Sequence, residues 1–323
     1  MAKAAVDLSA VIYGHAALKG IGVNSMIEIC NEQIRVAGRW ARIASLDADK
    51  YIFLDDPSTL IEHLKRSNTN IDLFTFLQRV SEPAPKYAYP MEWDNMAVLS
   101  ITTYDEWWTK QIGFKARNKA KQAGKKGVVI REVEFDHSLA KGIWAIYNET
   151  QVRQGRRFPH FGKDYAAVYA EEATYLSNSV FIGAYIDDLL IGFIKLVHDR
   201  TGMQAGLMNI VSMIAHRDKA PTNALMAKAV DSCAQRGIKH LVYSNFAYGK
   251  KQKSGLSDFK ERNGFVRVDV PRYYVPLTPR GALAFRLGLH HRFVDHLPES
   301  IAAKLRACRE AWYNRSLNSN EAL

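Results

Sequence analysis

Hydrophobic and polar positions follow an ordered series of patterns between about residues 128 and 277. The series opens on a strand-like alternation. Two stretches follow in which apolar residues recur every three or four positions, as they do on one face of a helix. The predicted helices are 137–154, 164–176, 223–236 and 256–262, and the predicted strands are 128–134, 180–186, 189–197, 203–215, 240–246 and 265–275.

Turn-forming residues separate these elements. Gly155 and Gly237 follow two of the predicted helices, and glycine is the residue that most often ends a helix. Asp187 and Asp188 stand between two strand patterns and predict a tight hairpin. The predicted order is therefore one strand, two helices, three consecutive antiparallel strands, and then helix, strand, helix and strand.

The first hundred residues predict a mixed α/β portion without a clear order of this kind. Strand patterns occur at 11–13, 26–29, 34–44 and 96–101, and helical patterns at 58–65 and 71–79. Residues 81–90 carry three prolines. They predict an irregular connection, because proline fits neither a regular helix nor a central strand.

A basic helix is predicted at 104–123, with Asp105 and Glu106 in its first turn and Gly124 at its end. Seven positive charges and no acidic residue lie between positions 110 and 126: Lys110, Lys115, Arg117, Lys119, Lys121, Lys125 and Lys126. Two interpretations stay open, a solvated face and a surface for an anionic substrate. The tail, 279–323, predicts two helices that either dock on the body of the protein or lie on an anionic membrane surface.

Composition is that of a soluble globular protein, with 47% hydrophobic and 24% charged residues. No apolar stretch is long enough to cross a bilayer, and the start has no apolar core of a signal peptide, so we expect a cytoplasmic protein. The net charge of +11 favours anionic partners. Cys30, Cys233 and Cys308 show no paired spacing, so neither a disulfide framework nor a metal site is expected.

Several segments resemble the GNAT acyltransferase superfamily. Residues 181–193 (FIGAYIDDLLIGF) are similar to its second and third strands, 259–265 (FKERNGF) to its late helix-to-strand signature, and 216–221 (HRDKAP) stand where the family has its pyrophosphate loop. The resemblance covers about 128–277. It implies an α+β fold with a mixed, mostly antiparallel sheet flanked by helices, and the transfer of an acyl group to an amine.

Two departures point to one branch of that superfamily. Ala220 and Thr222 stand where the loop usually has its small, flexible residues, and Pro221 lacks an N–H group. Phe259 replaces the tyrosine that protonates the leaving thiolate in many members. Two further segments, 117–130 (RNKAKQAGKKGVVI) and 147–156 (YNETQVRQGR), are similar to segments of the bacterial Fem-type (FemAB/FemX-like) aminoacyltransferases. With the two departures, they make the chain resemble this branch, whose members look like two fused GNAT folds and use aminoacyl-tRNA.

Three regions follow from these patterns. Residues 1–103 form an N-terminal α/β portion, which the Fem resemblance makes a degenerate second GNAT-like unit. Residues 104–278 form the GNAT-like acyltransferase domain, and 279–323 form the helical tail.

The candidate chemistry begins where the first helix of the series ends. Glu149 and His160 are candidate general bases, although Glu149 also fits a surface pair with Arg153 and a lone histidine is more often structural. Tyr243 and Asn245 end a strand on the expected cleft side and complete the catalytic set. The binding of a carboxylate or phosphate group of the substrate is assigned to Arg153, Arg156, Arg157 and Asn209.

Binding of the acyl donor is assigned to the loop 216–221, to the start of the helix after it and to flanking residues. A helix N-terminus binds phosphate through its N–H groups and its dipole. The donor-binding set is Ser212, Ile214, His216, Arg217, Lys219, Ala220, Thr222, Asn223 and Lys260. The expected donor is acyl-CoA or a related thioester, and the acceptor is a small-molecule or peptide amine. The alternatives are aminoacyl-tRNA as donor, with tRNA or an anionic membrane bound by the basic helix, and a non-catalytic binding protein.

Overall fold

The structure is a computed structural model that describes residues 25–67, 69–82, 84–153, 156–247 and 255–291, with the single residues 301, 304 and 308. The expected strand at 11–13 and nearly all of the second tail helix lie outside these residues. The elements are β1 (Ser25–Ile29), β2 (Glu32–Ala37), β3 (Ile43–Leu46), α1 (Pro57–Arg66), β4 (Leu73–Leu77), β5 (Met91–Ser100), α2 (Tyr104–Glu106), the π-helical turn η1 (Trp107–Gln111), α3 (Phe114–Lys125), β6 (Val129–Val133), α4 (His137–Asn148), β7 (Val152–Arg153), β8 (Arg156–Arg157), α5 (Tyr165–Glu172), η2 (Leu176–Asn178), β9 (Ser179–Ile186), β10 (Leu189–His198), β11 (Gln204–Ser212), η3 (Arg217–Lys219), α6 (Pro221–Gln235), β12 (His240–Asn245), α7 (Gly255–Arg262), β13 (Val266–Pro276) and α8 (Pro279–Arg286).

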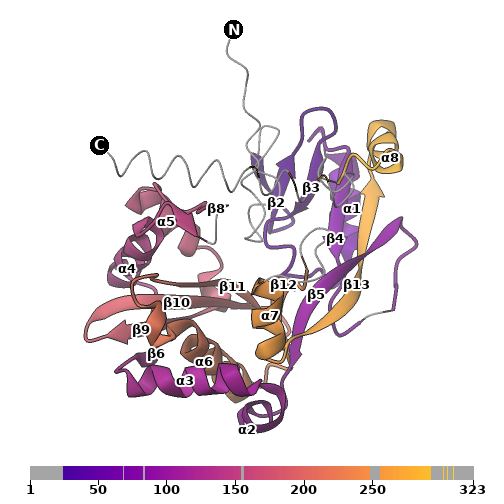
Figure 1. The fold of residues 1–323 in the computed structure, drawn as a ribbon. Coiled ribbons are helices and arrows are strands. Elements are labelled where there is room, and N and C mark those ends of the chain that lie inside the picture. The colour runs from indigo at the N-terminus through magenta and orange to yellow at the C-terminus, as the bar shows by residue number, and fades with distance from the viewer. Residues whose placement is uncertain are drawn as a thin grey trace.

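Within the described residues, an 11-stranded sheet runs through the molecule in the order β1-β2-β3-β4-β13-β5-β12-β11-β10-β9-β6 (Figure 1). Strands β3 and β4 run parallel, as do β11 and β12, and the other neighbours in this sheet are antiparallel. The predicted α+β class with a mixed, mostly antiparallel sheet flanked by helices is therefore confirmed.

The sheet consists of two units that repeat one succession of elements. The C-terminal unit (β9, β10, β11, α6, β12 and β13) has three antiparallel strands, a helix, a strand parallel to the third, and a final strand. The N-terminal unit (β1, β2, β3, α1, β4 and β5) has the same succession. The final strands are exchanged, because β13 lies beside β4 and β5 lies beside β12. The shared succession gives the N-terminal portion its GNAT-like character, while the predicted boundaries at 103 and 278 stay a prediction.

Helices cover both faces of the C-terminal unit (Figure 1). Helix α6 packs against β9, β10 and β11, and α3 packs along α6 on the same side. Helix α4 packs on β10 from the other side, together with α5. Strand β10 is buried at eight consecutive positions because it is covered on both faces, which explains its nearly continuous apolar run.

Four sequence-based elements need correction. The predicted strand 34–44 is two strands, because Gly38 turns the chain at a φ of 110° and an added Cβ would lie 2.1 Å from the Ala41 carbonyl oxygen. The predicted helix 71–79 is strand β4. All five of its residues are buried between β3 and β13, so it shows neither strand nor helix periodicity.

The other two corrections concern helix ends. The basic helix is interrupted after η1, where Ile112 is buried and the Gly113 N–H donates to the Arg262 carbonyl. The helix expected to reach residue 154 ends at Asn148, and β7 and β8 form a short hairpin beyond it. Among the described residues, no helix has both the length and the apolarity that a bilayer crossing needs.

Candidate functional site

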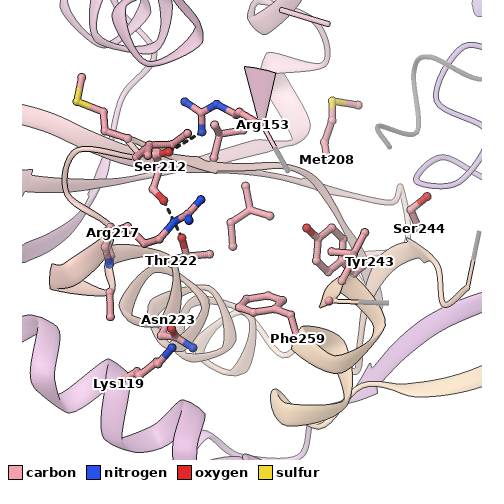
Figure 2. Close-up of a pocket in the computed structure, with 18 of the residues that line it drawn as sticks. Lys119, Arg153, Met208, Ser212, Arg217, Thr222, Asn223, Tyr243, Ser244 and Phe259 are labelled. Atoms are coloured by element: carbon pink, nitrogen blue, oxygen red, sulfur yellow. Dashed lines mark hydrogen bonds between the residues drawn. The ribbon is translucent and has the colours of Figure 1, made fainter. Parts of the chain in front are cut away.

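A cleft opens where β11 and β12 separate. These parallel strands are paired only at Gln204–Gly206 and His240–Val242, and beyond those positions they diverge. The space between them has a volume of about 320 Å³. Its lining comes from the end of β11, the loop and N-terminus of α6, the end of β12, α7, Arg153 of β7, one residue of α3, and Tyr51 of the N-terminal unit (Figure 2). The residues of this cleft are Tyr51, Lys119, Arg153, Met208, Ile210, Val211, Ser212, Met213, Ile214, Arg217, Ala220, Pro221, Thr222, Asn223, Tyr243, Ser244, Gly255, Leu256 and Phe259.

The charged side chains that line the cleft are all cationic. They are Lys119, Arg153 and Arg217, and no carboxylate or imidazole lines the cleft in the part of the chain that the structure describes. Lys119 and Arg217 are exposed, whereas the side chain of Arg153 is 13% exposed. Figure 2 shows Lys119 reaching from α3 towards Asn223 at the start of α6. The cleft is therefore suited to an anionic ligand.

The loop before α6 binds a carboxylate of the chain itself. The two oxygens of Glu149 accept hydrogen bonds from the backbone N–H groups of Ile214, at 2.7 Å, and Ala215, at 2.9 Å. Arg153 donates to the same carboxylate at 3.0 Å and to the Ser212 carbonyl at 2.6 Å. Glu149 therefore has the paired arrangement that was the alternative to a general base, and the pair ties α4 to the end of β11.

The rest of that loop has a restricted geometry. Ala220 has a φ of 53° and precedes Pro221, which takes the first helical position of α6. A left-handed conformation is strained for alanine, and the usual glycine would relieve it. The hydroxyls of Ser212 and Thr222 are 2.8 Å apart and close the loop onto β11.

A buried amine lies behind the wall made by Tyr243 and Phe259. The Nζ of Lys260 is 4.5 Å from the Tyr243 ring centroid and donates to the Asn245 carbonyl at 2.5 Å. Lys260 is 0% exposed. Burial, with a smaller contribution from the charge of Lys50, lowers the pKa of Lys260 to about 7. A lysine expected to contact the donor is thus enclosed beneath the cleft, and Asn245 also lies outside the lining.

Some predicted site residues lie away from the cleft. His160 is 5% exposed and stacks on Tyr147 at 4.1 Å. Asn209 is buried and donates to both oxygens of Glu172, which also accepts a 2.7 Å hydrogen bond from the Tyr147 hydroxyl. His160 and Asn209, the two predicted site residues of this buried region, therefore lie outside the lining.

The remaining predicted residues that lie outside the lining belong to β8 and to the loop before α6. Arg156 and Arg157 form β8 of the small hairpin, and His216 and Lys219 lie on the loop before α6. The structure therefore brings together Tyr243, Arg153, Ser212, Ile214, Arg217, Ala220, Thr222 and Asn223.

Among the cleft residues that sequence reasoning missed, Lys119 and Tyr51 come from segments far from the predicted site. Lys119 was recognised only as part of the basic helix, because the positive charge of that helix does not show where the helix packs. Tyr51 gave no signal, because it comes from the other unit, where it is 3% exposed and packs on Gly206 of β11. Cys233 is buried, and burial raises the pKa of its thiol to about 12, which leaves the thiol inert.

Comparisons with known proteins give structural but no sequence matches. No family model and no curated protein matches the chain. The crystal structure of FemX matches with a TM-score of 0.55 and 9% identity, over 82% of this chain and 90% of that one. The C-terminal domain of a lysylphosphatidylglycerol synthetase from Agrobacterium fabrum matches with a TM-score of 0.52 and 13% identity, over 82% and 88% of the two chains. L-PGS from Bacillus licheniformis gives a TM-score of 0.52 and 12% identity, also over 82% and 88%.

These identities establish the fold alone. The chain has a GNAT-like fold of the Fem type, and the likeness extends across both units. The recognition made from the sequence is therefore confirmed at the level of the fold.

Proposed function

We propose that the protein is an aminoacyltransferase that moves an amino acid from tRNA to an amine through the cleft between β11 and β12. The observation that carries the proposal is the cationic cleft whose loop N–H groups are already bonded to Glu149. Such a cleft suits an anionic donor that is held by side chains rather than by the loop backbone.

The loop is poorly suited to the diphosphate of CoA. Two of its backbone donors are engaged by Glu149, so they are not available to a diphosphate placed beside them. Pro221 contributes no N–H at the first position of α6. The donor we expected from the sequence, acyl-CoA, therefore loses the backbone contacts that normally hold it at a helix N-terminus.

The basic helix favours a polyanion. Helix α3 packs against α6, and its Lys119 lines the cleft. Lys110 and Lys126 form ion pairs with Glu106 and Asp218. No ion pair involves the other five cations among the described residues: Lys115, Arg117, Lys119, Lys121 and Lys125. Lys119 lines the cleft and Lys115 lies one helical turn before it, and exposed cations beside a cleft suit a phosphate backbone, whose binding depends steeply on salt.

The names of two similar structures agree with an aminoacyl group as the group transferred. Lysylphosphatidylglycerol is a phospholipid carrying a lysyl group, and the synthetases named after it match over most of this chain. We carry over only the class of the transferred group, and we expect a small-molecule or peptide amine as the acceptor. Charged tRNA is a cytoplasmic molecule, which agrees with the expected location.

The reaction forms a C–N bond and breaks the ester C–O bond to the ribose. The acceptor nitrogen loses a proton, and the ribose oxygen gains one. No carboxylate or imidazole lines the cleft in the described residues, so we assign proton relay to the Tyr243 hydroxyl and the substrates themselves. Arg217 and Lys119 neutralise donor phosphates, and Phe259 packs at the wall beside Tyr243.

Filter binding across a salt series, combined with a transfer assay, tests the proposal. Wild type is compared with a triple variant, Lys115→Glu, Lys119→Glu and Lys125→Glu. The matched control carries the same charge change at exposed sites outside the cleft: Lys65→Glu, Lys141→Glu and Lys239→Glu. We expect the first variant to lose aminoacyl-tRNA binding, with the salt slope reduced by about one unit for each lost phosphate contact, and the control to keep most of it.

The transfer assay uses a pool of tRNA charged with radiolabelled amino acids and a mixture of amine acceptors, and calorimetry with CoA runs in parallel. Label moved from tRNA to an amine supports the proposal. Binding of CoA without binding of tRNA would assign the donor to CoA and overturn it. Binding of neither donor would leave a GNAT-fold binding protein.

A further inference from the structure

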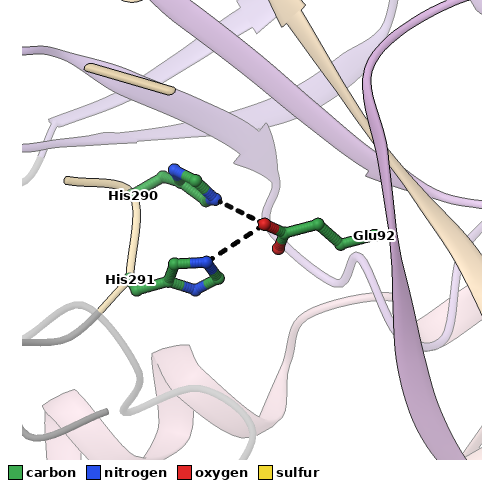
Figure 3. Close-up of side chains that lie close together, drawn as sticks. All are labelled: Glu92, His290 and His291. Carbon is green, nitrogen blue, oxygen red and sulfur yellow. Dashed lines mark hydrogen bonds and ion pairs between the residues drawn. The ribbon is translucent and has the colours of Figure 1, made fainter. Parts of the chain in front are cut away.

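A cluster of two histidines and one glutamate lies on the N-terminal side of the sheet. Glu92 is on β5, and His290 and His291 follow helix α8 (Figure 3). The Nε2 atoms of both histidines are 3.1 Å from the same oxygen of Glu92. None of the three residues lines the cleft of the proposed transferase site.

The end of α8 directs both rings to that carboxylate. Gly288 has a φ of 67°, and its N–H donates to the Phe285 carbonyl, while the Leu289 N–H donates to the Ala284 carbonyl. This left-handed ending turns the chain back towards β5. The other end of α8 is anchored too, because the Thr278 hydroxyl donates to Asp72 at 2.7 Å.

The surroundings hold the candidate ligands in place. The ring of His290 stacks on Phe285 with centroids 4.8 Å apart, and it contacts the Tyr274 ring at 4.6 Å. The side chain of His290 is 3% exposed, whereas those of Glu92 and His291 are 36% and 38% exposed. Tyr274 is also a hydrogen-bond partner of Glu92. One ligand is thus fixed in the protein, and the other two are open to an entering ion.

We propose that Glu92, His290 and His291 bind a divalent transition-metal ion, for which Zn²⁺ is the best match. Their ligand atoms all lie within 4.8 Å of one another. Zn²⁺ binds imidazole and carboxylate at about 2.0–2.2 Å, which separates two tetrahedral ligands by about 3.3–3.5 Å. Each 3.1 Å separation therefore has to widen by only a few tenths of an ångström.

Zinc bound here has three protein ligands and an open fourth position for water. It joins the end of α8, which follows the last strand of the C-terminal unit, to β5 of the N-terminal unit. The chemistry of two imidazoles and one carboxylate excludes calcium and magnesium as preferred ions, because these take oxygen ligands. The site is separate from the proposed transfer reaction and supplies a link between the two units.

Zinc titration by calorimetry tests the site. The protein is the full chain with Cys30→Ser and Cys308→Ser, because these exposed thiols also bind zinc. We expect one Zn²⁺ per chain. His291→Ala and Glu92→Gln should each weaken binding by about 100-fold or more, since loss of even an outer-shell partner costs 10–100-fold.

Glu92→Gln is the sharper variant, because its amide oxygen still accepts hydrogen bonds from the histidines but no longer offers an anionic ligand. His63→Ala, on the exposed face of α1, should bind zinc as the parent does. Circular dichroism checks that each variant is folded. A parent protein that binds no zinc, or variants that bind it unchanged, would overturn the proposal.

Discussion

The two units of the sheet have the same order of elements, but they differ in what lies at their parallel strand pair. In the C-terminal unit, β11 and β12 separate after three residue pairs and leave an open cleft. In the N-terminal unit, β3 and β4 also pair over only three positions, but Phe53 of the segment after β3 packs in one buried cluster with Leu77 of β4 and Val270 of β13. One unit thus keeps an opening at the place where the other is closed.

A buried ion cluster closes the N-terminal unit. Arg272 of β13 donates to Asp49 at 2.7 Å and to Asp94 at 3.0 Å. The side chain of Arg272 is 11% exposed, and the two carboxylates raise its pKa further despite its burial. Lys50 and Tyr51, from the same segment, reach the C-terminal unit, where Lys50 bonds to Asn245 and Tyr51 lines the cleft.

The comparison shows how a duplicated fold can confine binding to one copy. On the N-terminal side of the sheet, carboxylates of the chain pair with Arg35, Arg79 and Arg272. In contrast, Lys119 and Arg217 face the cleft. The segment that closes the first unit also builds a wall of the second. The first unit therefore acts as a scaffold for the cleft of its neighbour.

The largest expected effect comes from breaking the ion cluster. Arg272→Ala leaves Asp49 and Asp94 without their cation in a desolvated position, and it should lower the free energy of unfolding by about 3–5 kcal/mol. Chemical denaturation measures this change. The matched control is Arg267→Ala on the same strand, where the side chain is 56% exposed and only a small effect is expected. Equal losses in both variants would contradict a closing role for the cluster.

The buried lysine of the C-terminal unit should make stability depend on pH. Because burial lowers the pKa of Lys260 to about 7, the unfolded chain binds more protons than the folded one between that value and the ordinary 10.5. Stability should therefore rise with pH in this window. Relative to Lys260→Met, wild type should gain about 2–3 kcal/mol between about pH 6 and about pH 9.

Denaturation curves at several pH values measure this difference. Lys239→Met, which changes an exposed lysine, serves as the control and should differ from wild type by no more than about 0.5 kcal/mol at each pH. If wild type and Lys260→Met change in parallel with pH, the amine of Lys260 is not desolvated in solution.

The unneutralised cations of the cleft should matter for the donor and not for stability. Arg217→Ala and Lys119→Ala should each weaken binding of aminoacyl-tRNA by about ten- to a hundredfold, since a charge-assisted phosphate contact contributes about 1.5–3 kcal/mol. Lys219→Ala is the matched control, because it lies on the same loop but outside the cleft lining. A loss at Lys219 equal to that at Arg217 would show that net charge, rather than the cleft, governs binding.

The smallest effect is expected at the cleft wall. Phe259→Tyr places a hydroxyl where many GNAT enzymes have one, but the proton for the ribose oxygen is already assigned to the neighbouring Tyr243 hydroxyl. Transfer should stay within about threefold of wild type, far below the 10²–10⁴ contributed by a general acid. Single-turnover rates measure it, and Phe114→Tyr at an exposed site is the control. A loss of more than about a hundredfold would show that the site is packed differently from our assignment.

Much of the C-terminal unit was predictable from the sequence because its elements have local, amphipathic periodicity. The hairpin at Asp187, the strands β9 to β13 and helices α6 and α7 match the predicted patterns within a few residues. The loop before α6 and Tyr243 were also found, because a strand end and a helix start meet at one place in this fold.

Only the tertiary structure decided the rest, because it depends on contacts between residues far apart in the chain. Strand β4 is buried on both faces, so its pattern did not distinguish a strand from a helix, and the exchange of β5 with β13 has no local signal. The pairing of charges is equally non-local. The sequence determined that the protein has an excess of cations and a GNAT-like order, whereas folding decided that Arg272 is neutralised by Asp49 and Asp94 and that Lys119 faces the cleft.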